Sequence, residues 1–462
     1  MDYVVKYRLF PDEHQREQLD WVRDTVRQLY NHGLHRFNRI PESAGTVKQR
    51  VTKVRDELPD LKDWWTDLKN IYSTVLQQAL EQIATNIENL GKLKQKGFDV
   101  GSLNWKAPHE YRSFTYRQRG FELDEKSGPN GRGTLTLKKV NGENIDVPIR
   151  LHRDLPDETE VKHVTVKKDQ TGAWYACLNV EQDTPENPNP SEIDTEDTVG
   201  LDLGILKFIH DSDGRQISRL DLSNDRERLE REQRNLSRKE HGSNNWERQR
   251  CRVAEVHKRM RNKKADYKHK VAAFYTREYD AVFVEDLNVK GMLESNRNGR
   301  NTAEVGWRDF ITILKHHGRK RGCHVVEVDP TDTTKECSQC GVTTDKPLWV
   351  REHCCPSCGY TTDRDYNAAL NVWERGLGKL GVVHSEATSS ESLRDSDVRT
   401  RASLSLTSPE RKAFWCANES QSDSLTPVET GTAVETEESA SVSASSVVET
   451  GSPCLKEAAY GG

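Results

Sequence analysis

Four cysteines are spaced as ligands of a single metal ion. Cys337 and Cys340 form one C-x₂-C pair, and Cys355 and Cys358 form a second pair after fourteen intervening residues. Thiolates at this spacing close a tetrahedral site around Zn²⁺, and the glycine after each pair allows a tight turn. Four protein ligands leave no open position, so the pattern predicts a structural zinc. Cys354 would give C-x₃-C instead, and a pair of disulfides, which needs an oxidising compartment, is the alternative to metal.

Three carboxylates stand in or beside apolar segments far apart in the chain. Asp202 lies within the apolar run 199–203, Glu285 directly follows the apolar run 281–284, and Asp365 lies where a helix is expected to begin. Carboxylates that share two divalent ions can stabilise both the attacking and the leaving oxygen of a phosphoryl displacement, and such oxygen donors favour Mg²⁺ or Mn²⁺. Each acid also has a structural explanation, because buried acids can be hydrogen bonded and aspartate commonly caps helices.

Positive charge is concentrated between residues 219 and 270. This segment holds 17 Lys and Arg against 9 Asp and Glu, whereas the whole chain has a formal net charge of −5. A solvated helical face is the simple interpretation of such a run. The neighbouring acids and cysteines favour a phosphate-binding helical pair whose affinity falls with salt. The candidate nucleic-acid contacts are Arg248, Arg250, Arg252, Lys258, Arg259, Arg261, Lys263, Lys264, Lys268 and Lys270.

The first 180 residues predict helices followed by a small sheet. Tyr3–Phe10 alternates as a strand, and Asp12 with Gln15 forms a capping box that opens a helix. Apolar residues at a 3.6-residue period continue to about residue 93, with a second long helix expected from about residue 71. From about residue 113 the period changes to two, which predicts a small antiparallel sheet or barrel.

The rest of the chain predicts an α/β layer and an unstructured tail. Beyond a proline-rich acidic linker, strand signals at Val199–Ile209, 281–284 and 324–328 are interleaved with helices such as Trp307–Arg321. Residues 384–462 hold 13 acidic and 6 basic residues, and 25 of the 79 are Ser or Thr, which predicts a disordered acidic tail. With no run of eighteen apolar residues and no secretory signal, we expect a cytoplasmic protein without a membrane partner.

Taken in order, these motifs resemble the TnpB/OrfB family of transposon-encoded proteins, which are relatives of the compact type V CRISPR effector nucleases. The resemblance covers about residues 1–380. It rests on the four cysteines and on the segments 7–11, 29–31, 200–204, 236–238, 266–270, 284–289 and 363–371.

The resemblance implies a multidomain α+β fold. A helical recognition domain (11–103) would be inserted in a wedge-like β-barrel (1–10 and 104–183), and a linker (184–198) would follow. An RNase H-like, RuvC-type α/β nuclease domain (199–336 and 361–383) would contain basic helices (223–278) and an inserted zinc ribbon (337–360). The disordered tail (384–462) lies outside the resemblance.

The resemblance further implies an RNA-guided DNA endonuclease whose partners are a guide RNA and a target DNA. The RuvC acids, ligands of Mg²⁺ or Mn²⁺, would be Asp202, Glu285 and Asp365. We prefer Asp365 to Asp363 because the family's acid precedes an asparagine by two residues. Two other function classes are considered: a nucleic-acid-binding accessory or regulatory protein that does not cut, and a transposase that joins strands with the same acids.

Overall fold

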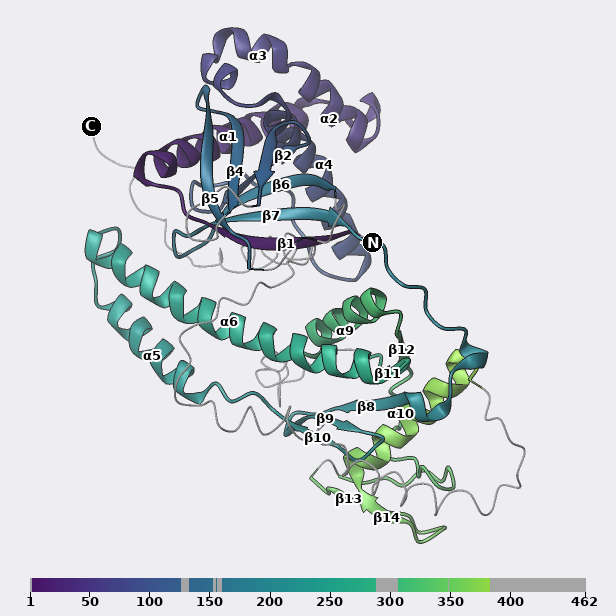
Figure 1. The fold of residues 1–462 in the computed structure, drawn as a ribbon. Helices are drawn as coiled ribbons and strands as arrows, with labels where there is room; N and C mark the ends of the chain where they lie inside the picture. The colour runs from purple at the N-terminus through teal and green to yellow at the C-terminus, as the bar shows by residue number, and fades with distance from the viewer. Residues whose placement is uncertain are drawn as a thin grey trace, which may run out of the picture. The chain divides into compact units, whose positions relative to one another are not determined.

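The computed structural model describes residues 2–125, 133–152, 155, 160–287, 306–347 and 349–382. They form two compact units with separate hydrophobic cores (Figure 1). The first unit comprises the chain up to Gln182 together with Leu236–Glu255, and the second comprises Asp183–Asn235 and the described residues from Val256 onward. The expected disordered tail lies outside the described residues. None of the described helices has an apolar stretch long enough to cross a lipid bilayer.

A seven-stranded antiparallel sheet forms the core of the first unit. Its strands follow the order β2-β6-β7-β1-β5-β4-β3, and the sheet curls into a nearly closed barrel, in agreement with the predicted small sheet or barrel. The strands are β1 (Asp2–Leu9), β2 (Ser113–Arg117), β3 (Phe121–Asp124), β4 (Gly133–Val140), β5 (Glu143–Arg150), β6 (Val161–Lys168) and β7 (Trp174–Glu181).

Four helices interrupt this sheet between β1 and β2. They are α1 (Glu13–Arg39), α2 (Val47–Asp56), α3 (Leu58–Trp64) and α4 (Ser73–Gln95), with short 3₁₀ turns at Glu42–Ala44 and Thr66–Asn70. The predicted capping box is confirmed. The carboxylate of Asp12 accepts from the backbone N–H of Gln15, and the side-chain oxygen of Gln15 accepts from the backbone N–H of Asp12. A Cβ atom at Gly33 of α1 would lie 2.3 Å from Leu80 of α4, so these two helices pack at close range.

The second unit is built on a five-stranded sheet of order β10-β9-β8-β11-β12. Strands β8, β11 and β12 run parallel, while β9 and β10 are antiparallel. The strands are β8 (Thr198–Leu203), β9 (Lys207–Asp211), β10 (Gln216–Ser218), β11 (Ala281–Glu285) and β12 (His324–Val328). The helices are α5 (Ser223–Ser237), α6 (Asn244–Glu278), α9 (Trp307–Arg321) and α10 (Arg364–Leu380), although the end of α5 and the start of α6, within Leu236–Glu255, belong to the first unit. A hairpin of β13 (Glu352–Cys354) and β14 (Thr361–Asp363) precedes α10.

The prediction of one strand over Val199–Ile209 is wrong. The segment forms two antiparallel strands, β8 and β9, joined by a tight turn. The amide of Gly204 donates to the carbonyl of Phe208 at 3.3 Å, and a Cβ at Gly204 would lie 2.7 Å from the Lys207 carbonyl. A glycine within an apolar run therefore marks a turn here, because only a residue without a side chain fits it.

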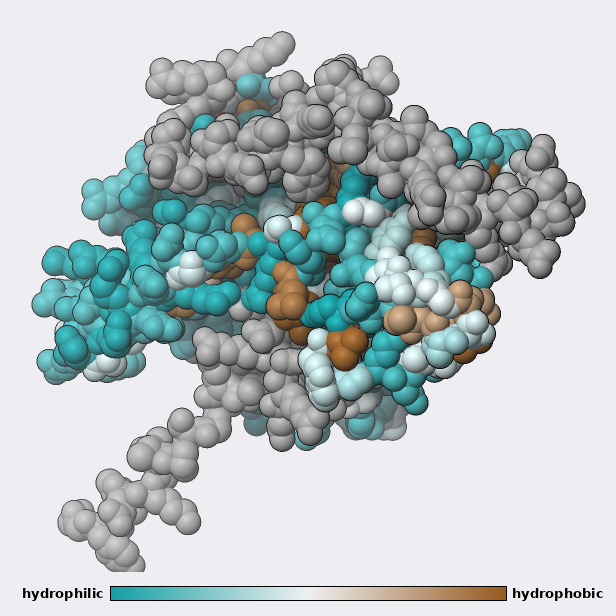
Figure 2. All heavy atoms as spheres, turned by 90° about the horizontal axis from the view of Figure 1, so that it is seen from below, coloured by the Kyte–Doolittle hydropathy of each residue, from teal (hydrophilic) through white to brown (hydrophobic). Residues whose placement is uncertain are grey.

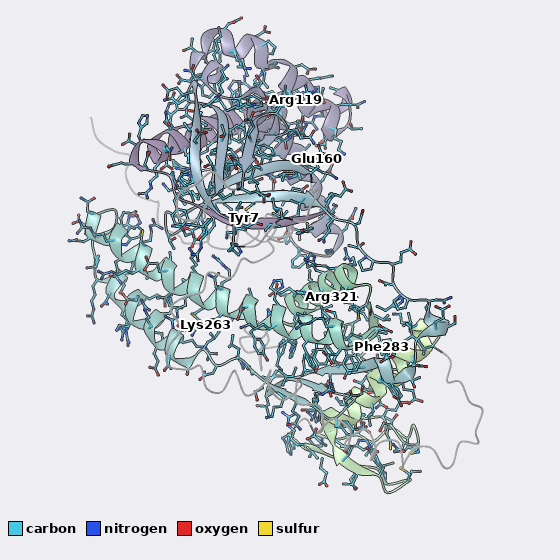
Figure 3. The ribbon with its side chains drawn as sticks, in the orientation of Figure 1. Tyr7, Arg119, Glu160, Lys263, Phe283 and Arg321 are labelled. Carbon is cyan, nitrogen blue, oxygen red and sulfur yellow. The ribbon has the colours of Figure 1, made fainter. Side chains whose placement is uncertain are left out.

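Helices cover both faces of the second sheet. Val199 and Leu201 pack into the core formed with α6 and α9. On the other face, a Cβ at Gly200 would lie 2.5 Å from the carbonyl of Ala369 in α10. Phe283 of β11, labelled in Figure 3, lies beneath Gly376 of the same helix. Since side chains alternate along a strand, residues 202 and 285 point to the α10 face.

Candidate functional site

Two of the three predicted acids are neighbours on the α10 face of the second sheet. Asp202 is 7% exposed and lies near the end of β8, and Glu285 is 6% exposed and ends β11. These strands are parallel, and Leu201 is paired with Val284. One step further along both strands sets Asp202 beside Glu285, at adjacent-strand spacing of about 4.8 Å.

The third acid approaches from the helix above. Asp365 is the second residue of α10, whose close packing on β8 is made possible by Gly200. Burial raises the pKa of Asp202 well above its usual value, and the charges of Glu285 and Asp365 raise it further. Burial also raises the pKa of Glu285. The fold therefore gathers mutually repelling carboxyl groups, an arrangement that a bound cation would relieve.

Two arginines hold the carboxylate of Asp365. Nη1 of Arg351 lies 3.1 Å from both oxygens, and Nη2 of Arg364 lies 3.2 Å from Oδ1. The neighbouring Asp363 instead caps α10, accepting from the amides of Asp365 and Tyr366. Of the two aspartates, Asp365 contributes more to the raised pKa of Asp202. Sequence reasoning did not single out Arg351, because nothing in the spacing shows that the segment before β13 reaches α10.

Glu285 is held by a loop that α10 supports. The hydroxyl of Thr333 donates to Oε1 of Glu285 at 2.5 Å. The amide group of Asn371 donates to the carbonyls of Thr333 and Glu336 at 2.8 Å each, and Asn367 donates to the Glu336 carbonyl at 2.7 Å. Both asparagines occur in the motif that carried the family resemblance, but nothing in the spacing of residues along the chain indicates this role.

The four predicted cysteines come together as a cluster. Their sulfur atoms all lie within 4.8 Å of one another, with Sγ–Sγ distances of 3.7 Å for Cys337–Cys358 and 3.5 Å for Cys340–Cys355. Zn–S bonds of about 2.3 Å in a tetrahedron require sulfur separations of about 3.8 Å. The same separations are far too long for a disulfide, whose S–S bond is about 2.05 Å. Cys354 is exposed and outside the cluster.

Backbone geometry shapes the two turns that carry these thiols. Gly341 and Gly359 have φ values of 73° and 75°, the left-handed region, and their amides donate to the carbonyls of Cys337 and Cys355. Backbone N–H groups, that of Cys358 above all, lower the pKa of Cys355 to about 6. Burial raises the pKa of Cys337 to about 12, so this thiol would release its proton on binding a metal. The four sulfur donors and their separations fit a Zn²⁺ ion.

Known proteins are similar in sequence to this chain over most of its length. Residues 176–296 match the OrfB_IS605 family model, described as "Probable transposase". A protein of Streptomyces pristinaespiralis, named as an RNA-guided DNA endonuclease, is 31% identical over 382 residues, which are 81% of this chain and 89% of that protein. The chain belongs to the TnpB/OrfB family. Its relative InsQ of Escherichia coli K12, also named as an RNA-guided DNA endonuclease, is 29% identical over 400 residues, or 82% and 93% of the two chains.

Two further family models match other parts of this TnpB/OrfB protein. Residues 307–372 match "Cas12f1-like, TNB domain", a range that contains the cysteine cluster, and residues 1–42 match a model described as "Helix-turn-helix domain". In the structure, residues 2–39 form β1 and the single long helix α1. A cryo-EM structure of a Cas12f1–sgRNA–target DNA complex shares the fold, with a TM-score of 0.52, 16% identity, and coverage of 78% of this chain and 83% of that one.

Most of the predicted basic residues lie at the surface of this TnpB/OrfB protein. Arg259 and Lys263 pair with Asp225 of α5 at 3.1 and 2.7 Å, and Figure 3 labels Lys263 on the side of α6 next to α5. Lys268 differs, since it is 4% exposed and bonded to Asp309. Figure 2 shows one mainly hydrophilic face with small separate hydrophobic patches. The exposed members of the set are Arg248, Arg252, Arg259, Arg261, Lys263 and Lys270, whereas Arg250, Lys258 and Lys264 are partly buried.

Proposed function

We propose that this protein is an RNA-guided DNA endonuclease that hydrolyses DNA phosphodiesters at Asp202, Glu285 and Asp365. The observation that carries the proposal is the placement of these acids on one face: β8 and β11 pair in parallel, and α10, which carries Asp365, packs against β8 at Gly200. The charges of Glu285 and Asp365 raise the pKa of the buried Asp202, in agreement with this placement. Sequence similarity to two bacterial proteins named as RNA-guided DNA endonucleases supports the assignment. A non-cutting accessory protein would have no need to retain three converging acids.

The three carboxylates would hold Mg²⁺ or Mn²⁺, because hard oxygen donors suit these ions. When bound, a pair of such cations supplies charge neutralisation at the attacking and leaving oxygens of a phosphodiester. The protein's own contribution is position. Thr333 orients Glu285, Arg351 and Arg364 orient Asp365, and the packing of α10 on Gly200 sets the distance between helix and sheet.

The cysteine cluster would hold one structural Zn²⁺, with Cys337, Cys340, Cys355 and Cys358 as ligands. The segments that flank the cysteine cluster also contact the residues that hold the acids, so the ion would have a structural role in this site. Arg351, four residues before Cys355, binds Asp365, while the carbonyl of Glu336, just before Cys337, accepts a hydrogen bond from Asn367 of α10. A stable cluster would therefore hold both flanking segments against the acid site.

A guide RNA and a target DNA are the proposed partners. Base pairing would read sequence, while the protein would hold the heteroduplex through its backbone. The exposed basic residues of α6 are the proposed phosphate contacts, and we leave out Lys268 because it is buried. We also propose that the barrel, its inserted helices and the second unit correspond to the wedge, recognition and RuvC-type nuclease domains, and that the protein acts in the cytoplasm.

The test uses purified protein, the RNA transcribed from the end of the transposon that encodes it, and a DNA whose sequence matches that guide RNA. Wild-type protein should cut the DNA in the presence of Mg²⁺. Asp202→Ala should bind RNA and DNA normally, but its cutting rate should fall by about 10³-fold, because one shared metal ligand is missing. Glu374→Ala, at an exposed position of α10, is the matched control and should cut normally. Equal cutting by Asp202→Ala and wild type would refute the proposal.

A further inference from the structure

A buried histidine lies opposite the first catalytic acid. His210 of β9 is 5% exposed, and the antiparallel register pairs it directly with Asp202 of β8. Residues paired in this way have Cβ atoms about 5 Å apart on the same face of a sheet. The imidazole therefore lies on the α10 face, where its ring packs against that of Tyr366 with centroids 5.6 Å apart.

The imidazole also reaches the cap of α10. Nδ1 of His210 lies 3.4 Å from Oδ1 of Asp363. That same oxygen accepts from the backbone amides of Asp365 at 2.9 Å and Tyr366 at 3.2 Å. The imidazole on β9 and the first turn of the helix that carries Asp365 thus meet at one carboxylate oxygen.

These contacts divide the control of Asp365 between two groups of residues. Arg351 and Arg364 bind its side-chain oxygens. The backbone of the same turn is held by Asp363, which His210 connects to the strand pair bearing Asp202. The His210–Asp363 contact is therefore a second link, besides the close packing of α10 on Gly200, between the strand that carries Asp202 and the helix that carries Asp365.

We propose that His210 is a positioning residue of the acid site. With the proton on Nδ1, the imidazole donates a hydrogen bond to Asp363. This bond holds the first turn of α10 at the distance from β8 where Asp365 and Asp202 can bind the same cation. The consequence for cutting rests on the proposed function. The contact itself is a statement about the fold and can be tested without any cutting.

The experiment compares His210→Phe with His210→Asn in the full chain bound to its RNA. Phenylalanine keeps the ring against Tyr366 but has no donor, whereas the amide of asparagine places a donor near the position of Nδ1. We expect His210→Phe to weaken Mn²⁺ binding, followed by electron paramagnetic resonance, and to slow cutting by about 10-fold, because the turn that carries the proposed ligand Asp365 loses one of its supports. His210→Asn should recover most of both losses.

Amide hydrogen exchange supplies a measurement that needs neither metal nor DNA. His210→Phe should speed exchange of the Asp365 and Tyr366 amides, while exchange in the middle of α10 stays unchanged. Asp363→Ser, which can still cap a helix but is too short to reach His210, should match His210→Phe. The double variant His210→Phe/Asp363→Ser should then show the same exchange rates at Asp365 and Tyr366 as either single variant. If His210→Phe does not fold, the comparison of Asp363→Ser with wild type carries the test.

Two results would overturn the proposal: normal Mn²⁺ binding and exchange in His210→Phe, or equal impairment of His210→Phe and His210→Asn. A failure of the proposed function looks different. In that case the wild-type protein would not cut DNA, and it would bind Mn²⁺ no more tightly than Asp202→Ala. The exchange measurement would still decide whether His210 holds the first turn of α10.

Discussion

The cysteine cluster and the acid site lie in the same unit but are built in opposite ways. Each pair of cysteines is shaped by its own short turn, where a left-handed glycine returns an amide to the first cysteine's carbonyl. The acids come instead from two strands and a helix, and they repel one another in a buried setting. The comparison shows that thiolate ligands can be arranged locally, whereas a carboxylate centre has to be assembled by the whole α/β layer.

The largest expected effect separates the two sites by the sign of their stability changes. Cys340→Ser removes a proposed zinc ligand, so zinc content should fall, residues 333–363 should exchange faster, and cutting should be lost, because structural zinc contributes folding free energy. Glu285→Gln should also abolish cutting, but it should raise the melting temperature of the Mg²⁺-free protein, since it removes a carboxylate that burial disfavours and that repels Asp202. Metal analysis, hydrogen exchange and thermal melting provide the measurements. A lower melting temperature for Glu285→Gln would contradict the comparison.

A smaller effect should appear when the connection between the two sites is cut. Asn371→Ala leaves the buried carbonyl of Thr333 without this donor, whereas the Glu336 carbonyl keeps its bond from Asn367, and the loss should cost about 1–3 kcal/mol of unfolding free energy. Because Thr333 also holds Glu285, cutting should fall although no acid or cysteine is changed. Urea unfolding and cutting rates test this, with Glu374→Ala as control. Unchanged cutting would show that the two sites are independent.

A pH effect of about 1.4 kcal/mol is expected from a buried acid outside both sites. Burial is the main cause that raises the pKa of Asp211 to about 7 from its ordinary 3.8. The folded protein therefore holds this proton up to a higher pH than the unfolded chain does, and stability decreases as pH rises from 6 to 8. Asp211→Asn should flatten the dependence of the unfolding free energy on pH in that window. An unchanged slope in the variant would show that other groups produce it.

The smallest effect concerns the basic helix. Arg261→Ala, at an exposed position, should weaken nucleic-acid binding slightly and reduce the slope of log K against log salt by about one, as loss of one phosphate contact does. Lys268→Ala should leave that slope unchanged and lower stability instead, because Lys268 is buried against Asp309. Binding titrations at several salt concentrations measure both. A slope change for Lys268→Ala alone would reverse this assignment.

Local patterns allowed more of the protein to be predicted than long-range ones. The capping box of Asp12 and Gln15 formed as expected, since a cap depends on residues three positions apart. The apolar run Val199–Ile209 was misjudged as one strand, because hydrophobicity is the same on both sides of the turn at Gly204. In the basic run, Lys268 could not be distinguished from its exposed neighbours, because its partner Asp309 lies on another helix.

By itself the sequence determined the ligand chemistry: four thiols at knuckle spacing, and three acids attached to elements that fold next to one another. Tertiary structure decided which groups support them. His210, Arg351 and Asn371 reach the site from β9, from the segment before β13 and from the middle of α10. Their roles could not be read from spacing, because a side chain's partner is set by how strands and helices pack, and residues 14 to 153 positions apart become neighbours when they do.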